Sequence, residues 1–471
     1  MNVASGVWRF ALGACWLLSA AHARADEQPS TDAQPRAEAP RKSEPPKKRA
    51  VPNYDGRGGT PEPRARKALW VPRVLLFPAY VVSEYVVRRP LAAGITYAEK
   101  QRWPSAIADF LALDEVHPVG VVPFMLIDFG FEPSAGLYAY WDDAGFKGHS
   151  LRLRGSTWGP HWLSGTLKER FQFENFEIFL KGKLTRRPDF TFYGLGPDTR
   201  ESNLTRYAGR TAYAHFQTRL AFGGRSALET IAGYRGAKFG PSDYDSDDRG
   251  QPGYQPSLDE AVAAGTLAEP PGFRDGYRAP FAGARLLLDS RGKKQTRNGV
   301  RLDMLAEQSV DLANSPSSGW LRYGGTFGGF VDLMEGGRFV ALAFNVILVD
   351  PIGERAVPFT QLAALGGAGT MPGLRFGRLY GRSSAVVDLR YTWPIWLSLR
   401  GSLQAAVGNV FGAHFEGFRT GRARLSTALG LETNGGGDDI FQALVGFGTE
   451  TFETGAELDS IRFVVGVREG F

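Results

Sequence analysis

Residues able to do chemistry are scattered along this chain and do not form a recognisable catalytic set. The 471-residue sequence contains no G-x-S-x-G elbow, no H-E-x-x-H pair and no phosphate-binding P-loop. Its six histidines lack the spacing of metal ligands, and its one cysteine is Cys15. We therefore predict no enzyme, no metal site and no cofactor. A hydrolase site on a loop or in a lumen is the less favoured alternative.

Four aspartates lie close together at positions 243, 245, 247 and 248. Carboxylates at alternate positions are typical of calcium-binding loops. However, glycine is missing at the sixth position, and Tyr254 stands where the bidentate glutamate belongs. A solvated acidic loop is therefore the favoured interpretation of this segment.

The segment 365–381 has an unusual density of glycine around a central Arg375–Phe376 pair. Glycine permits tight bends and close approach of the backbone to its neighbours. A surface loop needs neither property, whereas a long loop folded back into a barrel lumen needs both. The residue types thus predict a compact, inward-folded loop.

The elements that would surround such a loop are strands, because the hydrophobic period from Val119 onward is two. The last strand illustrates the pattern, with apolar residues on one face, namely Ile461, Phe463, Val465, Val467 and the terminal Phe471. Polar residues and glycine occupy the other face. In an exported chain, such strands are typical of a transmembrane β-barrel with lipid outside and a polar lumen inside.

Counting these runs predicts an all-β fold, a sixteen-stranded antiparallel transmembrane barrel over residues 119–471. The predicted strands are 119–129, 134–143, 148–158, 161–173, 175–186, 205–222, 226–238, 280–289, 297–308, 319–333, 337–350, 383–397, 400–411, 422–433, 439–450 and 459–471. The connections sort into short turns and long loops, the long ones including 187–204, 239–279, 309–318 and 351–382. Barrels place these two kinds at opposite rims, so the sorting supports the strand assignment.

Three segments precede the barrel. Residues 1–25 have an apolar stretch and an Ala-Arg-Ala cleavage site, which predict a secretory signal peptide. Residues 26–67 are rich in proline and charge and predict a disordered linker. Residues 68–118 predict a short, partly helical periplasmic or lumenal segment. The chain carries 59 glycines and a net charge of only +6, which with export argues against a nucleic-acid partner.

The order of motifs in the second half resembles the BamA–FhaC superfamily of outer-membrane proteins, the bacterial surface antigen barrels. The matching residues are Asp289 and Arg291 with Gly299, then Gly366, Gly367, Gly373, Arg375, Phe376 and Gly377, then Asp388, then Gly408 and Asn409, and finally Phe471. The segment Tyr193–Thr199 also looks like barrels of this family. Residues 68–118 lack the length and strand pattern of a POTRA domain, so we expect a form without POTRA domains.

The resemblance implies a loop arginine that contacts acidic residues on the following strands. Arg375 matches that arginine, Phe376 occupies the place of the family's glycine, and Ala406 replaces the second acid. Asp388 is therefore the expected partner, and an Arg375–Asp388 contact would lock the loop in the lumen. The alternative is that Asp388 pairs with a lumenal arginine such as Arg390.

These features together predict a protein of the bacterial outer membrane. The favoured function, implied by the resemblance, is participation in the insertion of outer-membrane proteins or in secretion. The alternative is a passive or substrate-specific channel. The expected partners are outer-membrane lipid, client outer-membrane or secreted proteins and a separate periplasmic protein.

Overall fold

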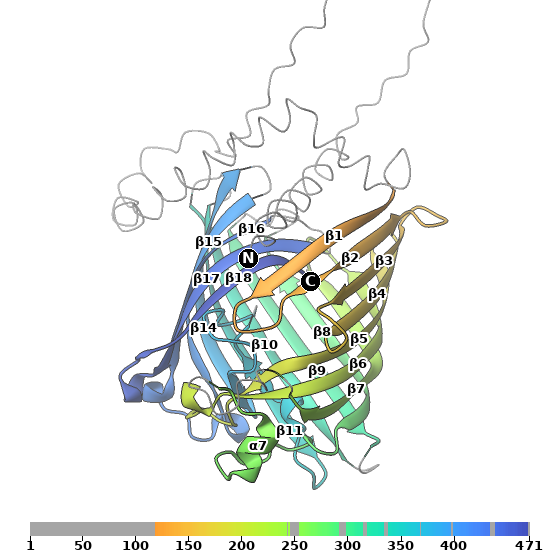
Figure 1. The fold of residues 1–471 in the computed structure, drawn as a ribbon. Helices are drawn as coiled ribbons and strands as arrows, with labels where there is room; N and C mark the ends of the chain where they lie inside the picture. Colours follow the sequence, from red (N-terminus) through yellow and green to blue (C-terminus); the bar gives the residue numbers. More distant parts are fainter. Residues whose placement is uncertain are drawn as a thin grey trace, which may run out of the picture.

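The alternating segments form long strands that close into an antiparallel barrel (Figure 1). The computed structural model describes residues 118–242, 244, 254–291, 298–313, 318–333, 338–367, 369–396, 399–433 and 439–469. Within these residues the barrel has sixteen strands. Each pairs with the next strand along the chain, except that β11 pairs with β14, and β18 pairs with β1 to close the barrel. The predicted fold class is therefore confirmed.

The barrel strands are β1 (Val119–Asp128), β2 (Ser134–Asp142), β3 (His149–Thr157), β4 (Leu163–Gln172), β5 (Phe176–Phe192), β6 (Thr205–Ala221), β7 (Ala227–Pro241), β8 (Tyr277–Asp289), β9 (Gly299–Asp311), β10 (Ser318–Asp332), β11 (Phe339–Ile352), β14 (Ser383–Trp396), β15 (Leu399–Phe411), β16 (Arg424–Thr433), β17 (Asp439–Thr451) and β18 (Leu458–Glu469). Two short strands, β12 (Ala363–Leu365) and β13 (Leu379–Gly381), pair with each other in a separate sheet. The one α-helix of the described residues is α7 (Leu258–Ala263).

Alternate residues of the strands face outward and are apolar. Leu184 of β5 is 66% exposed, Phe344 of β11 is 48% exposed, and Phe463 of β18 is 45% exposed. Closure leaves the ladder without free edges over most of the wall, so the backbone polar groups are satisfied internally. A closed, even-numbered antiparallel barrel with an apolar outer face spans the outer membrane.

Several strands extend farther than predicted at the rim with the long connections, called here the long-loop end. β5 runs to Phe192 and β7 to Pro241, because their ladders with β6 continue above the apolar band. β14 departs from the prediction at its other end. Alternation with the exposed Val387 and Leu389 would put Ile395 on the lipid face, but Ile395 is buried, because a bulge between Pro394 and Trp396 shifts the register and reverses the alternation.

The connections at the long-loop end pack into the barrel mouth around an aromatic core. Phe359, from the connection between β11 and β14, contacts Phe192, Tyr207, Phe273 and Tyr380 with ring centroids 5.3–6.3 Å apart. Because these rings come from loops and from strand ends, they tie the loops to the wall.

The predicted signal peptide 1–25, linker 26–67 and segment 68–118 lie outside the described residues, apart from residue 118. The described part of the chain holds no helix long and apolar enough to cross a membrane.

Candidate functional site: the inward loop and the barrel seam

The connection between β11 and β14, residues 353–382 and called loop 6 here, folds back into the lumen. The Gly373 N–H donates to Ser426 Oγ at 2.8 Å, and Ser460 Oγ donates to the Gly373 carbonyl at 2.7 Å. Ser460 is buried whereas its neighbour Ile461 is exposed, so Ser460 lies on the inner face of β18. The tip of loop 6 therefore rests on the inside of the barrel wall.

Glycine is required where loop 6 turns and where it touches the wall. Gly366 and Gly377 have φ values of +109° and +78°, which side chains rarely adopt. A Cβ on Gly373 would lie 2.1 Å from the Phe447 carbonyl oxygen, and one on Gly377 would lie 2.3 Å from that of Thr191. The glycine pattern thus serves a loop packed between two walls, β17 on one side and β5 on the other.

Apolar side chains of loop 6 form a small core of their own with β14 and β15. Its members are Leu365, Met371, Leu374, Leu379, Val386, Ala406 and Val410. Burial of these side chains stabilises the folded-in position of the loop by the hydrophobic effect. Ala406 is a fully buried small residue of this core.

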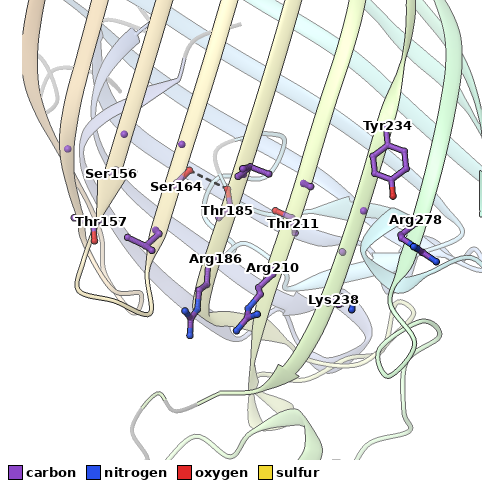
Figure 2. A pocket seen from close by; sticks show the side chains of 18 of the residues that line it. Ser156, Thr157, Ser164, Thr185, Arg186, Arg210, Thr211, Tyr234, Lys238 and Arg278 are labelled. Atoms are coloured by element: carbon purple, nitrogen blue, oxygen red, sulfur yellow. Dashed lines mark hydrogen bonds between the residues drawn. The ribbon is translucent and has the colours of Figure 1, made fainter. Parts of the chain in front are cut away.

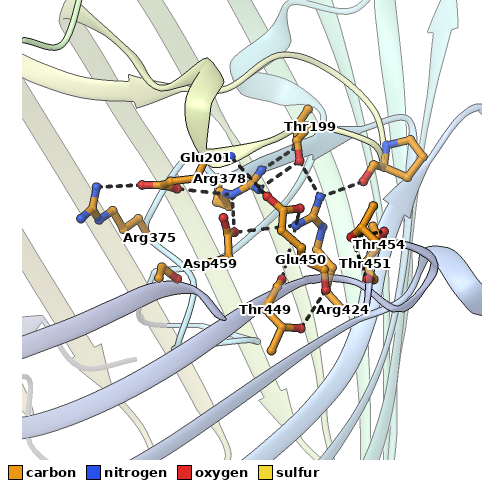
Figure 3. A network of polar contacts seen from close by, with 12 residues as sticks. Thr199, Glu201, Arg375, Arg378, Arg424, Thr449, Glu450, Thr451, Thr454 and Asp459 are labelled. Carbon is orange, nitrogen blue, oxygen red and sulfur yellow. Dashed lines mark hydrogen bonds and ion pairs between the residues drawn. The ribbon is translucent and has the colours of Figure 1, made fainter. Parts of the chain in front are cut away.

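A network of buried charges joins loop 6 to the wall (Figure 3). Arg378 is fully buried and lies 2.9 Å from Asp459 Oδ2 and 3.2 Å from Glu450 Oε1. It also donates to Thr199 Oγ1 at 2.6 Å and to the Thr199 carbonyl at 3.0 Å. One guanidinium therefore connects loop 6, strands β17 and β18, and the connection between β5 and β6.

A second buried arginine shares these partners. Arg424 of β16 donates to Glu450 Oε2 at 2.6 Å and to the Pro197 carbonyl at 3.2 Å. Buried ionised groups are tolerated only when they are paired and hydrogen-bonded, and both arginines meet that condition. This network of ion pairs and hydrogen bonds therefore connects loop 6 to β16, β17 and β18 at the long-loop end.

Arg375 contacts Glu201 and does not contact Asp388. Its Nη1 lies 3.2 Å from Glu201 Oε1, on the 3₁₀ helix η2 (Glu201–Asn203) between β5 and β6. Asp388 accepts a hydrogen bond from Gln404 Nε2 at 2.7 Å, and Gln404 Oε1 accepts one from Arg390 at 3.1 Å. The partner predicted for Arg375 is therefore wrong, because Gln404 on the adjacent strand reaches Asp388 while η2 brings an acid to the loop.

Glu201 has an unusual electrostatic environment. Burial, followed by the nearby Asp459 and Glu450 carboxylates, raises the pKa of Glu201 to about 7, and the Arg375 and Arg378 charges only partly oppose this. The ion pair between Arg375 and Glu201 is therefore sensitive to pH in the neutral range.

Phe376 lies beside a cavity of the lumen. Its side chain is 45% exposed and contributes to the lining of a cavity of about 620 Å³. Arg154, Lys183, Arg187 and Arg322 also line this cavity. Loop 6 thus occupies one side of the lumen and leaves a basic cavity on the other.

The seam between β1 and β18 is short. Among the described residues, three register pairs join these strands, Leu126 with Gly466, Ile127 with Val465 and Asp128 with Val464, and just beyond them the Phe129 N–H donates to the Phe463 carbonyl at 2.9 Å. By comparison, eight pairs join β1 to β2 and eleven join β17 to β18. Over Val119–Met125, the described part of the chain gives β1 a partner strand on its β2 side only.

Arg462 of β18 holds the seam at its long-loop end. It is buried and contacts Asp128 of β1 through two nitrogens, at 3.0 and 2.6 Å. It also donates to the Gly367 carbonyl at 2.6 Å and to the Pro372 carbonyl at 3.2 Å. The same side chain therefore joins both seam strands and loop 6.

The remaining motif residues occupy structural positions elsewhere. Asp289 and Arg291 form a buried pair at 2.7 Å in the turn after β8, and Gly408 approaches the Ala385 carbonyl, which a Cβ would meet at 2.3 Å. Asn409 is buried and donates to the Pro197 carbonyl at 3.2 Å. Phe471 lies outside the described residues. No group of three or more metal-ligating side chains occurs among the residues that the structure describes.

The sequence did not single out the buried charges Arg378, Arg424, Glu450 and Asp459. Arg462 was visible as a polar residue on the inner face of the last strand, and this was its only signal. Thr199 belongs to Tyr193–Thr199, one of the segments behind the predicted resemblance, and its hydroxyl and carbonyl oxygens accept hydrogen bonds from Arg378.

No protein-family model and no curated protein sequence matches the chain. Among solved structures, it is similar to BamA from Haemophilus ducreyi lacking POTRA domains 1–3, with 16% identity over 74% of this chain and 70% of that one, at a TM-score of 0.49. CdiB from Acinetobacter baumannii is 12% identical, over 74% of this chain and 59% of its own, at a TM-score of 0.44. Wzi, a carbohydrate-binding barrel of Escherichia coli, is 10% identical over 78% and 86%, at 0.32. Such values are too low to transfer an activity.

Proposed function

We propose that this outer-membrane barrel takes part in inserting or secreting proteins, with the β1–β18 seam as the point of opening. The observation that carries the proposal is the seam itself, which among the described residues has three register pairs where neighbouring strands have eight and eleven. An unpaired strand edge is a template for another strand, because its N–H and C=O groups are free to extend the sheet. Among the described residues, β1 pairs with β18 over Leu126–Asp128 only, so Val119–Met125 is the stretch that would receive such a strand.

Two further features fit this role. Gly466 has a φ of +149°, and a Cβ there would lie 2.3 Å from the Met125 carbonyl oxygen, so any side chain would clash at the seam. Arg462 ties the long-loop end of the seam to loop 6. Opening would therefore start at the other end, and loop 6 would act as the lock that keeps the barrel closed.

The test uses the purified chain in liposomes and the folding rate of an unfolded outer-membrane barrel as the readout. A disulfide between Ile127→Cys and Val465→Cys would tether the seam, since these residues are direct partners. The matched control joins Val445→Cys to Phe463→Cys across the well-paired β17–β18 ladder. The natural sequence has only Cys15, within the predicted signal peptide, so background pairing is low.

We expect the wild-type protein to accelerate client folding over protein-free liposomes. The oxidised seam tether should abolish this acceleration and reduction should restore it, while the control tether changes nothing. No acceleration by the wild type would contradict the proposal. Steady, ohmic conductance in planar bilayers would favour the channel function instead, since loop 6 and the aromatic core obstruct the lumen.

A further inference from the structure

The outer wall carries a row of basic residues at the long-loop end (Figure 2). The row consists of Arg186 of β5, Arg210 of β6, Lys238 of β7 and Arg278 of β8. Each lies on the outer face of its strand, at the long-loop end of the apolar outward residues. On β5 this stripe includes Leu184, two residues before Arg186 and therefore on the same face. The four cations thus mark the limit of the apolar band at the long-loop end of four neighbouring strands.

The strand register places these like charges next to one another. Arg186 is the direct partner of Arg210, and Arg210 is the direct partner of Lys238. Neighbouring strands lie about 4.8 Å apart, and like charges directly opposite each other destabilise a sheet. In the part of the chain that the structure describes, no acidic side chain forms an ion pair with any of the four. Within the described residues these charges are therefore not neutralised, and an external anion would stabilise the row.

Next to the row of cations, on the side towards the short-turn end, the wall is hollow (Figure 2). The next row along the strands runs through Leu137, Gly155, Gly165, Leu184, Ala212 and Gly236, so the exposed Leu137 and Leu184 flank the two glycines Gly155 and Gly165. A Cβ on Gly155 or Gly165 would meet no atom within 4 Å, so neither glycine is needed for packing within the chain. The two rows enclose a groove of about 930 Å³.

The position of the groove along the membrane normal fits a lipid headgroup level. β5 starts at Phe176 beside a short turn, and Arg186 is ten residues farther along. At about 3.3 Å per residue and a strand tilt of roughly 40°, this is a rise of about 25 Å, the height of the apolar band of such barrels. Cations at this level face the headgroups of the leaflet on the long-loop side, which is the outer leaflet.

We propose that this groove is a binding site for a phosphorylated lipid of the outer leaflet. An acyl chain would lie over the glycines between Leu137 and Leu184, and the phosphate would lie against Arg186, Arg210 and Lys238. Arginine and lysine bind phosphate through charge-assisted hydrogen bonds, and basic clusters beside a membrane-spanning wall attract anionic lipid. The inference does not depend on the proposed function of the seam.

A single rim cation would need no such explanation, because long basic side chains extend towards the headgroup region on their own. The combination here is different. Three cations are in direct register, none has an acidic partner among the described residues, and an unfilled apolar groove leads to them.

The test is native mass spectrometry of the full chain in non-ionic detergent, with bisphosphorylated lipid A, phosphatidylcholine and inorganic phosphate as separate probes. Three variants are compared with the wild type. R186Q/R210Q/K238Q removes the row, G155L/G165L fills the groove, and R274Q/R355Q/R419Q removes three exposed loop cations at the same rim as a control. Retention of the heat-modifiable folded band on a gel verifies that each variant forms a barrel.

We expect the wild type to retain lipid A and not phosphatidylcholine or free phosphate. Each cation beside an anionic lipid contributes about a fivefold preference, so R186Q/R210Q/K238Q should bind roughly 100-fold more weakly. G155L/G165L should weaken lipid A binding without any change of charge, and the control should bind as the wild type does. Equal losses in the control and the row variant would overturn the site, as would unchanged binding in G155L/G165L. Binding of inorganic phosphate as tight as that of lipid A would show an anion site rather than a lipid site.

Discussion

The β1–β18 seam and the β5–β6 pair are both adjacent strands of one barrel, yet they are held by different means. Among the described residues, fifteen residue pairs join β5 to β6, and three join β1 to β18. At the seam, side chains add to this short ladder, with Arg462 contacting Asp128 and the loop 6 backbone. The stability of the wall is thus built into its backbone, whereas closure of the seam depends on a few side chains and one loop.

The largest loss of stability should come from substitution of Arg378, which anchors loop 6. Arg378→Ala would leave the buried Asp459 without its closest cation, at a cost of about 3–5 kcal/mol in the free energy of unfolding. Urea unfolding of the barrel in micelles measures this. The control is Arg170→Ala on β4, whose side chain is 42% exposed and whose pair with Glu177 should contribute under about 1 kcal/mol. Similar losses of unfolding free energy in the two variants would mean that the loop 6 anchor is no more important for stability than an exposed ion pair of the wall.

Arg462→Ala should act on the seam more than on the whole barrel. Loss of its charged hydrogen bonds should cost roughly 2–3 kcal/mol. The expected signature is faster hydrogen exchange in β1 and β18, with β5 and β6 unchanged. The control, Arg219→Ala on β6, removes an ion pair with Glu229 from the well-paired wall and should leave exchange in β1 as it is. Unchanged exchange in β1 for Arg462→Ala would mean that the seam does not depend on this side chain.

The raised pKa of Glu201 should make a smaller contribution to stability, and this contribution should depend on pH. The folded state raises it from 4.5 to about 7, so between these values the folded protein binds more protons than the unfolded chain. This group therefore stabilises the fold most fully below about pH 4.5, and its contribution is lost as the pH rises through 7. We expect the Tm of the wild type to fall more between pH 5 and pH 8 than that of Glu201→Gln. Parallel pH profiles of the two proteins would contradict this assignment.

The barrel could be predicted from the sequence because apolar and polar residues alternate with a period of two in the strands. All sixteen predicted strands are present. The glycines of loop 6 were also informative, since a backbone that passes within 2.1 Å of where a Cβ would lie tolerates no other residue. These features are local, and a single sequence displays local features directly.

The buried charge network was not predictable in the same way. Asp459 has the same parity as Ile461 and Phe463, so alternation assigns it to the lipid face. A register shift between β17 and β18 at this position turns it inward, where its side chain is fully buried against Arg378. Likewise, Glu201 reaches Arg375 only because the connection after β5 enters the barrel mouth. Bulges and loop paths depend on tertiary packing, which residue spacing does not reveal.

The smallest expected effect is a coupling between Arg375 and Asp388, the two residues that the family resemblance had paired. Since Arg375 contacts Glu201 and Asp388 contacts Gln404, the two side chains share no partner. Free-energy changes of substitutions without shared partners add within about 0.3–0.5 kcal/mol. Arg375→Ala, Asp388→Ala and the double variant, measured by urea unfolding, should therefore be additive within that range.

Arg375→Ala with Glu201→Ala is the matched positive cycle. These residues form an ion pair at 3.2 Å, so removing both should cost less than the sum of the single changes. Because Glu201 is already largely neutral below pH 7, the coupling should be larger at pH 8 than at pH 5. Strong coupling between Arg375 and Asp388, with none between Arg375 and Glu201, would restore the pairing expected from the sequence and place the tip of loop 6 against β14.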